Sequence, residues 1–322
     1  MNEPVSDTTL DDTAIDRLRG DVRAVISGDK LSQKAVADDS GVPAGTFNAW
    51  LAASYRGDNA RVAADVAKWL EARRQRNRIK AIVPQAPAFI QTKTAKSIVN
   101  VFEYAQTLHD MGLIIGSPGT GKTCATEYYQ AANPNVFVGT MEPAKSSTHH
   151  LLLELASVLK ISEKAALAIS DAVVRRLRGR DALLIIDEAQ HLQSSAIDQL
   201  RTIHDKAKCG VVLCGNENLI GKLGDPDRTP QLAQLYSRFG MRLTIPRPKT
   251  DDIDALLKAW AVEEKDEKAF MRAVASKPGG LRALTKTMIA AGATAAGNDE
   301  TRGLAHMRDA WGRVGAGPIG NS

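Results

Sequence analysis

Short apolar runs separated by longer mixed segments dominate the middle of the chain. Apolar runs occupy residues 113–115 and 183–186, and the segments 135–139, 210–214 and 241–245 combine several apolar residues in the manner of short strands. Four consecutive apolar residues, as at 183–186, are typical of a strand buried on both faces of a parallel sheet. We therefore expect an α/β core built on a parallel sheet, with helices in the segments between the strands.

The pattern of residues 31–51 predicts two short helices joined by a glycine turn. Ser32 is placed to cap the first helix, and Ala35 and Val36 would form its buried face. Gly41 would supply the turn. The second helix would direct inward the apolar residues at helical spacing, Phe47, Trp50 and Leu51. This arrangement matches a helix-turn-helix, whose second helix enters the major groove. A generic helical hairpin is the alternative.

The outward face of that second helix offers few groups that can distinguish bases. Its first residues, Ala44 and Gly45, cannot make bidentate contacts with base edges. Thr46 and Asn48 remain as candidate DNA contacts, together with Gln33 on the first helix. We expect a domain that holds phosphates and the groove more than it reads sequence.

Basic residues crowd the stretch from residue 68 to residue 80, where only Glu71 opposes them. Pro84 and Pro87 follow, as expected for a helix that runs into an extended linker, so we place a domain boundary near residue 80. Arg73 and Arg74 are candidate phosphate contacts in this run. The alternative is a solvated helix end that the helix dipole favours.

A glycine-rich loop with a fixed spacing follows the first apolar run. Glycines allow the backbone to curl and aim its N–H groups at one point, and a helix that starts after the loop adds its positive end. Lys122 would bind the outer phosphates and Thr123 would ligate Mg²⁺. The candidate ATP-binding residues are Gly116, Ser117, Pro118, Gly119, Thr120, Gly121, Lys122 and Thr123.

A second motif, Asp187 and Glu188, follows the apolar run at 183–186. Ligands of open α/β sheets lie at the carboxyl ends of the strands, so we expect Asp187 beside Thr123, where it would hold Mg²⁺. Glu188 would then polarise the attacking water. Many buried strands end in a carboxylate, but the two motifs together indicate a nucleotide-hydrolysing site.

Three further polar residues are weaker candidates when each is taken alone. Asn216 ends a predicted strand and could orient water, although Asn after Gly is also ordinary turn chemistry. Arg238 precedes the last predicted strand, and Arg282 follows two glycines at a predicted helix start. A surface arginine and a simple helix turn are the corresponding alternatives.

Composition limits the possible classes of protein. The chain has 322 residues, 43% of them hydrophobic and 25% charged, which is ordinary for a soluble globular protein of two or three domains. Aromatic residues make up 5% and argue against base-stacking platforms. No run approaches the roughly 18 apolar residues of a membrane span. The polar N-terminus and three cysteines without metal-ligand spacing favour a cytoplasmic setting.

The order of these motifs resembles that of AAA+ ATPases. With the helix-turn-helix in front, the string Asp-Glu-Ala-Gln-His-Leu at 187–192 and the Ser-Arg-Phe box at 237–239, the chain resembles the MuB-like ATPases of Mu-like transposing phages. The resemblance covers residues from about 20 to about 290. It implies that Asn216 and Arg282 sense the nucleotide and that Arg238 is an arginine finger acting on a neighbouring subunit.

The resemblance also implies partners and a domain plan. We expect a helix-turn-helix domain at 1–80, an AAA+ core at 81–248, a helical lid at 249–314 and a flexible tail at 315–322. ATP with Mg²⁺ would support filaments on double-stranded DNA, and a transposase would capture that DNA and stimulate hydrolysis, in the cytoplasm of a bacterium or phage-infected host. Two alternatives are an ATPase-controlled transcriptional regulator and an AAA+ remodeller of proteins.

Overall fold

The computed structural model describes residues 11–223, 238–315, 317 and 319, and its chain divides into two compact units. The first unit is Met1–Val83 and the second is Pro84–Ser322. None of the helices in these described ranges combines the length and apolar character that a membrane span requires. Most of the predicted tail and the residues just before Arg238 lie outside the described ranges.

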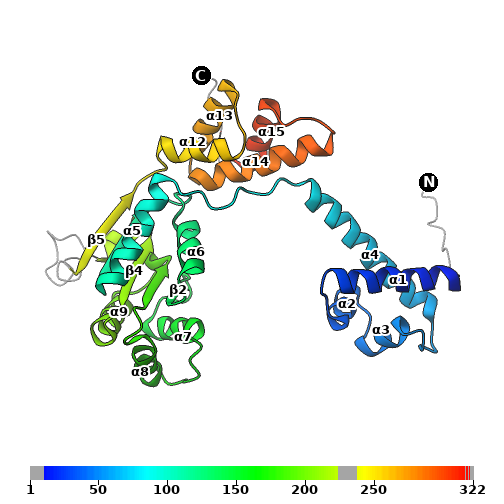
Figure 1. The fold of residues 1–322 in the computed structure, drawn as a ribbon, viewed down its shortest axis with the longest axis horizontal. Coiled ribbons are helices and arrows are strands. Elements are labelled where there is room, and N and C mark those ends of the chain that lie inside the picture. Colours follow the sequence, from blue (N-terminus) through cyan, green and yellow to red (C-terminus); the bar gives the residue numbers. More distant parts are fainter. Residues whose placement is uncertain (1–10, 224–237, 316, 318, 320–322) are drawn as a thin grey trace. The chain divides into compact units, whose positions relative to one another are not determined.

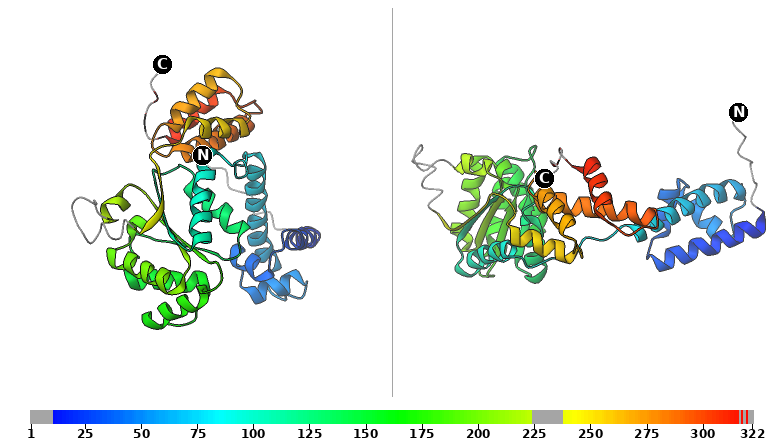
Figure 2. Two further views of the ribbon diagram at one scale, coloured as in Figure 1. Left: turned by 60° about the vertical axis from the view of Figure 1, so that its left-hand side comes forward. Right: turned by 90° about the horizontal axis from the view of Figure 1, so that it is seen from above.

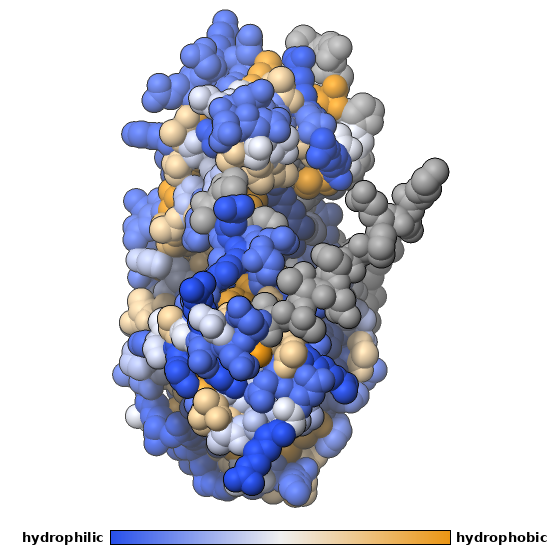
Figure 3. Space-filling model, turned by 90° about the vertical axis from the view of Figure 1, so that its right-hand side faces the viewer, coloured by the Kyte–Doolittle hydropathy of each residue, from blue (hydrophilic) through white to orange (hydrophobic). Residues whose placement is uncertain are grey.

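The described residues of the N-terminal unit form four helices around a core that contains Val22, Val36, Phe47 and Trp50. They are α1 (Asp12–Gly28), α2 (Gln33–Ser40), α3 (Ala44–Leu51) and α4 (Asn59–Ile82). The helix pair α2 and α3 is the predicted one, with Gly41 in a left-handed turn at φ 74°. Figure 3 shows one side of the molecule, where most residues are hydrophilic and the hydrophobic residues form small separate patches.

The start of α2 was predicted correctly, but its buried face was not. The Ser32 hydroxyl accepts a hydrogen bond from the Ala35 backbone N–H, as expected for a cap. Val36 and Ala37 are buried, whereas Ala35 is exposed. The prediction that Ala35 lies in the core is therefore wrong, because the first turn of α2 directs this side chain to solvent.

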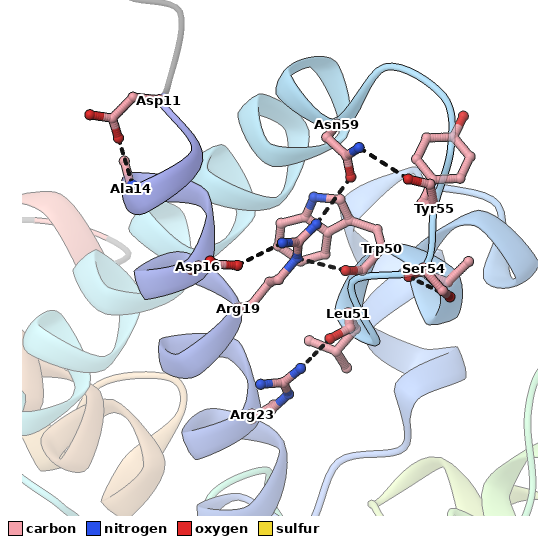
Figure 4. A network of polar contacts seen from close by, with 11 residues as sticks. Asp11, Ala14, Asp16, Arg19, Arg23, Trp50, Leu51, Ser54, Tyr55 and Asn59 are labelled. Atoms are coloured by element: carbon pink, nitrogen blue, oxygen red, sulfur yellow. Dashed lines mark hydrogen bonds and ion pairs between the residues drawn. The ribbon is translucent and has the colours of Figure 1, made fainter.

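Two arginines of α1 fix the end of α3. The Arg19 Nε donates a hydrogen bond of 2.7 Å to the Trp50 carbonyl, and Arg23 donates one to the Leu51 carbonyl (Figure 4). The last carbonyls of a helix have no partner within the helix, and cations are favourable there. Arg19 also lies over the Trp50 ring and donates to Asn59 Oδ1 at 3.0 Å. These contacts join α1, α3 and the start of α4.

Five parallel strands form the sheet of the second unit in the order β2-β3-β4-β1-β5. Their bounds are β1 (Met111–Gly116), β2 (Val136–Thr140), β3 (Leu183–Asp187), β4 (Gly210–Gly215) and β5 (Phe239–Ile245). All five coincide with predicted strands, and β5 begins two residues before the predicted one. Their carboxyl ends meet at one edge of the sheet, where the two phosphate-site motifs were expected.

Helices cover both faces of the sheet (Figures 1 and 2). Leu113 and Ile115 of β1 pack into the apolar cluster formed with α7, α8 and α9, while Ile114 packs on the other face with α5 and α6. The bounds are α5 (Lys93–Leu108), α6 (Lys122–Ala132), α7 (Thr148–Leu159), α8 (Ala166–Leu177), η1 (Ala189–His191), α9 (Ser194–Ala207) and α10 (Asn218–Leu223). Burial on both faces explains the continuous apolar runs of the central strands.

The C-terminal helices form a separate layer with its own core around Leu257, Met271, Met288 and Trp311. They are α12 (Thr250–Ala259), α13 (Lys265–Ala275), α14 (Gly280–Gly297) and α15 (Leu304–Val314). Asp252 ties this layer to α5, because its buried carboxylate accepts hydrogen bonds from the Thr94 backbone N–H at 3.1 Å and from the Thr94 hydroxyl. The fold is therefore the expected α/β core with a helical lid.

Candidate nucleotide-binding site

The glycine-rich loop joins the end of β1 to the start of α6, as expected. Gly121 caps α6 with φ 93°, and Gly119 has φ 81°, conformations that favour glycine. A Cβ on Gly119 would lie 1.8 Å from the Gly279 carbonyl oxygen, so no side chain fits there. The loop therefore needs glycine both for its curvature and for its close contact with the lid.

The Lys122 ammonium is held inside this loop. Its Nζ donates to the carbonyl oxygens of Gly116 at 2.6 Å and Ser117 at 3.1 Å. Burial lowers the pKa of Lys122, although the Asp187 and Glu188 carboxylates oppose the effect. No ion pair of Lys122 occurs among the described residues. The hydrogen-bond acceptors of the Lys122 ammonium are therefore neutral carbonyl oxygens. An anionic ligand at the loop would form an ion pair with this ammonium.

Thr123 and Asp187 lie together at the carboxyl edge of the sheet. The Thr123 hydroxyl donates to Asp187 Oδ2 at 3.2 Å, and Asp187 Oδ1 accepts from the Glu188 backbone N–H at 2.9 Å. Burial raises the pKa of Asp187. A hydroxyl beside a buried carboxylate is a suitable donor set for a small hard cation such as Mg²⁺. The two residues are thus brought together as the strand order predicted.

Glu188 and Asn216 follow β3 and β4 and both line one cavity. Glu188 has a left-handed backbone at φ 53° and an exposed side chain. Asn216 Oδ1 accepts from the Asn218 backbone N–H at 3.0 Å, which is the turn chemistry considered as the alternative for this residue. The same side chain therefore caps a turn and borders the cavity.

That cavity has a volume of about 330 Å³, within the range of small-molecule sites. Its walls are the glycine-rich loop, the start of α14 and residues 86–90, which connect the N-terminal unit to the core. Phe89 in this connector stacks on Tyr128 with 4.2 Å between ring centroids. Phosphate-binding groups thus border one side of the cavity, and apolar residues border another.

The lid contacts the loop directly. The Leu281 backbone N–H donates to the Gly119 carbonyl at 2.9 Å, and Arg282 lines the cavity next to it. Lys286, one helical turn later on α14, lines the same cavity. In the described parts of the chain neither cation forms an ion pair with a carboxylate. The site therefore presents cations from two sides.

Arg238 lies at the opposite edge of the sheet from this cavity. Gly116 pairs with Ile245 at the carboxyl end of β5, whereas Arg238 precedes the amino end of this strand of 7 residues. At the rise of an extended strand the two ends are roughly 20 Å apart. Arg238 is half-exposed and lies 3.5 Å from the Asp205 carboxylate. It therefore cannot reach the glycine-rich loop of the same chain.

The candidate DNA contacts lie on the N-terminal unit, and two of them form ion pairs with carboxylates of the same unit. Gln33 and Asn48 are exposed, and Thr46 is partly buried. Arg73 forms an ion pair with Asp29 at 2.8 Å and lies over the Trp69 ring, while Arg74 pairs with Asp21 at 2.7 Å. Both arginines are thus held by carboxylates of α1 and the residue after it.

Sequence reasoning missed three parts of the cavity and its surroundings. The connector at 86–90 carries no motif, although Pro84 and Pro87 indicated extended chain in this part of the sequence. Lys286 could have been found from its spacing of four residues after Arg282. Gln190 is buried and lies two residues after Glu188. The string at 187–192 contains this glutamine, but the sequence predicted no role for it.

Comparisons with known proteins agree with this geometry. Residues 106–223 match the family described as AAA domain, and residues 237–313 match the family described as Mu B transposition protein, C terminal. The Orc1 protein of Aeropyrum pernix, solved in complex with DNA, has a TM-score of 0.52 and 18% identity over 71% of this chain and 67% of its own. This likeness concerns the fold alone.

Full-length relatives are more similar. The ATP-dependent target DNA activator B of Escherichia phage Mu is 32% identical over 299 residues, which cover 92% of this chain and 95% of the relative. The Mu-like prophage FluMu DNA transposition protein B of Haemophilus influenzae is 34% identical over 267 residues, 81% of this chain and 92% of the relative. The chain therefore belongs to the Mu B family of phage transposition proteins and is an ATPase of the AAA+ class.

Proposed function

We propose that this protein binds target DNA in an ATP-dependent way, with little sequence preference, and delivers the DNA to a transposase. Hydrolysis would then release the protein from the DNA. The observation that carries this proposal is the similarity over 92% of the chain to a relative named as an ATP-dependent target DNA activator. The cations that line the cavity without carboxylate partners support the use of ATP.

We infer the following roles in hydrolysis. The loop 116–121, Lys122 and Thr123 bind the phosphates, and Thr123 and Asp187 hold Mg²⁺, which would neutralise charge that develops on the phosphates. Glu188 orients and activates the attacking water. Asn216 and Arg282 contact the nucleotide from the sheet edge and the lid. These roles are supported by the shared cavity and by the contact between Thr123 and Asp187.

Arg238 would act on ATP held by a neighbouring subunit. Its position at the far edge of the sheet supports this role, because it cannot reach its own loop. Hydrolysis would then require self-association into an oligomer or filament. On the N-terminal unit, Gln33, Thr46, Asn48, Arg73 and Arg74 would contact DNA, and the two arginines would exchange a carboxylate for a phosphate.

One binding experiment separates this proposal from its alternatives. Duplexes of several lengths and unrelated sequences are incubated with the protein and ATP, ADP or no nucleotide, and binding is read by filter retention. We expect binding that needs ATP, grows with duplex length and differs little among sequences. A single sharp sequence motif would favour the transcriptional regulator, and nucleotide-independent or absent DNA binding would favour the protein remodeller.

A further inference from the structure

Gln190 connects the two strand ends that border the cavity. It lies in η1, directly after β3, and is only 6% exposed. Its side-chain Nε2 donates to Glu188 Oε2, and its Oε1 accepts from the Asn216 backbone N–H at 3.2 Å. One buried amide therefore joins the carboxylate after β3 to the backbone after β4.

The contact restricts a side chain that little else holds. Glu188 is exposed. Among the described residues, Gln190 provides a side-chain hydrogen bond to the Glu188 carboxylate. A buried amide is costly unless both its ends are paired, so the Gln190 side chain has one favourable orientation here. The Glu188 carboxylate is thereby bound to the Gln190 amide, and the backbone at the end of β4 fixes the position of that amide.

The neighbouring strand leaves room for this amide. A Cβ on Gly215 would lie 2.8 Å from Gln190 Oε1 and 3.0 Å from Leu219 Cδ2. Both atoms are the far ends of flexible side chains, so a methyl group at Gly215 would displace them without moving backbone. Glycine at the end of β4 thus keeps open the space that the Gln190 amide occupies.

We propose that Gln190 is a positioning residue, which orients the Glu188 carboxylate toward the cavity by anchoring it to the carboxyl end of β4. The proposal rests on the role of Glu188 proposed above. A hydrogen bond at the carboxylate and another at the Asn216 backbone fix the direction of the carboxylate relative to the bound phosphates. Gln190 itself does not border the cavity.

The first test replaces Gln190 with methionine, which keeps the side chain's length and removes the hydrogen bonds of the amide to Glu188, Asn216 and the His191 ring. With long duplex DNA present, we expect kcat for ATP hydrolysis to fall about 10- to 100-fold, as for a misplaced catalytic group, while KM for ATP changes less than about twofold. Gln193→Met, an exposed glutamine three residues later, is the matched control and should retain wild-type kcat. An unchanged kcat in Gln190→Met would overturn the proposal.

The second test asks whether the effect passes through Glu188. In a Glu188→Gln background, Gln190→Met should cause no further loss, because the group that it positions is already gone. The same fold loss in both backgrounds would show that Gln190 supports the structure in general. If Glu188→Gln alone retains wild-type turnover, the proposed function of Glu188 fails first, and the two failures are thereby distinguished.

A second variant covers the case in which Gln190→Met does not fold. Gly215 itself lines the cavity, so the affinity for a fluorescent ATP analogue is measured beside kcat. Gly215→Ala should fold and lose kcat as Gln190→Met does, because its methyl group displaces the Gln190 amide. Wild-type kcat in a folded Gly215→Ala protein would contradict the proposal.

Discussion

Several arginine side chains of the N-terminal unit bind groups that pack this unit together, whereas three cations line the cavity without a carboxylate partner among the described residues. Arg19 and Arg23 hold carbonyls of α3, and Arg74 pairs with a carboxylate. Lys122, Arg282 and Lys286 line the cavity, and the described residues provide no ion pair for any of them. The comparison teaches that the count of basic residues does not locate an anion site, whereas several cations that line one cavity without carboxylate partners do.

Arg238 lies outside both groups, and its loss should have the largest effect. Because a guanidinium supplied from a neighbour stabilises charge on the transferred phosphoryl group, Arg238→Ala should reduce turnover by roughly 10³-fold or more while nucleotide binding persists. ATPase assays on mixtures with Glu188→Gln protein provide the check. Subunits that retain Glu188 can then receive Arg238 from their neighbours, so part of the activity should return.

A finger that acts within its own subunit would give no rescue in this mixture, since each subunit lacks one essential group. Specific activity that stays flat across protein concentration would also contradict action between subunits. Arg201→Ala serves as a control, because Arg201 is a partly exposed arginine on α9 that lies 3.8 Å from Asp198.

The next effect concerns the cavity itself. Lys122→Ala should weaken ATP binding roughly 10- to 100-fold, because a hydrogen bond to a charged group contributes about 1.5–3 kcal/mol. ATP-dependent DNA binding should fall with it. Titration with a fluorescent ATP analogue measures the change, and Lys145→Ala is the control, because Lys145 is exposed and lies 3.3 Å from Glu142. Equal affinities for the two variants would remove Lys122 from the site.

The arginines used internally should affect stability instead of nucleotide binding. Arg19→Ala leaves the Trp50 carbonyl without its partner and should lower the free energy of unfolding of the N-terminal unit by about 1–3 kcal/mol. Urea unfolding followed by circular dichroism measures this. Arg17→Ala, an exposed arginine on the same helix, should change stability by less than about 0.5 kcal/mol. Similar values for the two variants would show that the contacts in Figure 4 contribute little.

The smallest expected effect concerns Arg74, which pairs with Asp21 and is also a proposed contact for a DNA phosphate. If Arg74 exchanges Asp21 for a DNA phosphate, Arg74→Ala should weaken DNA binding a few-fold and reduce the salt slope by about one. Asp21→Asn removes the competing carboxylate and should strengthen binding. Affinity measured over a range of salt concentrations tests both, with Asp65→Asn as a control for lost negative charge. A salt slope unchanged in Arg74→Ala would assign this arginine to structure alone.

The sequence predicted those parts of the site that depend on local chain geometry. A glycine-rich loop between strand and helix places Lys122 and Thr123 by itself, and parallel strands bring Asp187 to the same edge. The partners of Arg73 and Arg74 could not be predicted in this way. They lie 44 and 53 residues earlier in the chain, and their distance in space depends on how α1 packs on α4.

Short helices were a second limit. In α2, of 8 residues, alanines flank Val36 on both sides, and the apolar pattern does not decide which alanine is buried. Gln190 shows a third limit. The role of a buried polar residue depends on its contacts, and Gln190 contacts the backbone of Asn216, which follows it by 26 residues in sequence.

The separation of Arg238 from the cavity of the same chain would affect how many complete sites an assembly contains. If each subunit completes the site of the next, an open row of N subunits contains N − 1 complete sites, whereas a closed ring contains N. One end of every open row then keeps a subunit with intact ATP, whatever the rate in the interior. The terminal subunit makes up a larger share of a short row. If hydrolysis releases the protein from DNA as proposed, the lifetime of a row on DNA would therefore depend on its length.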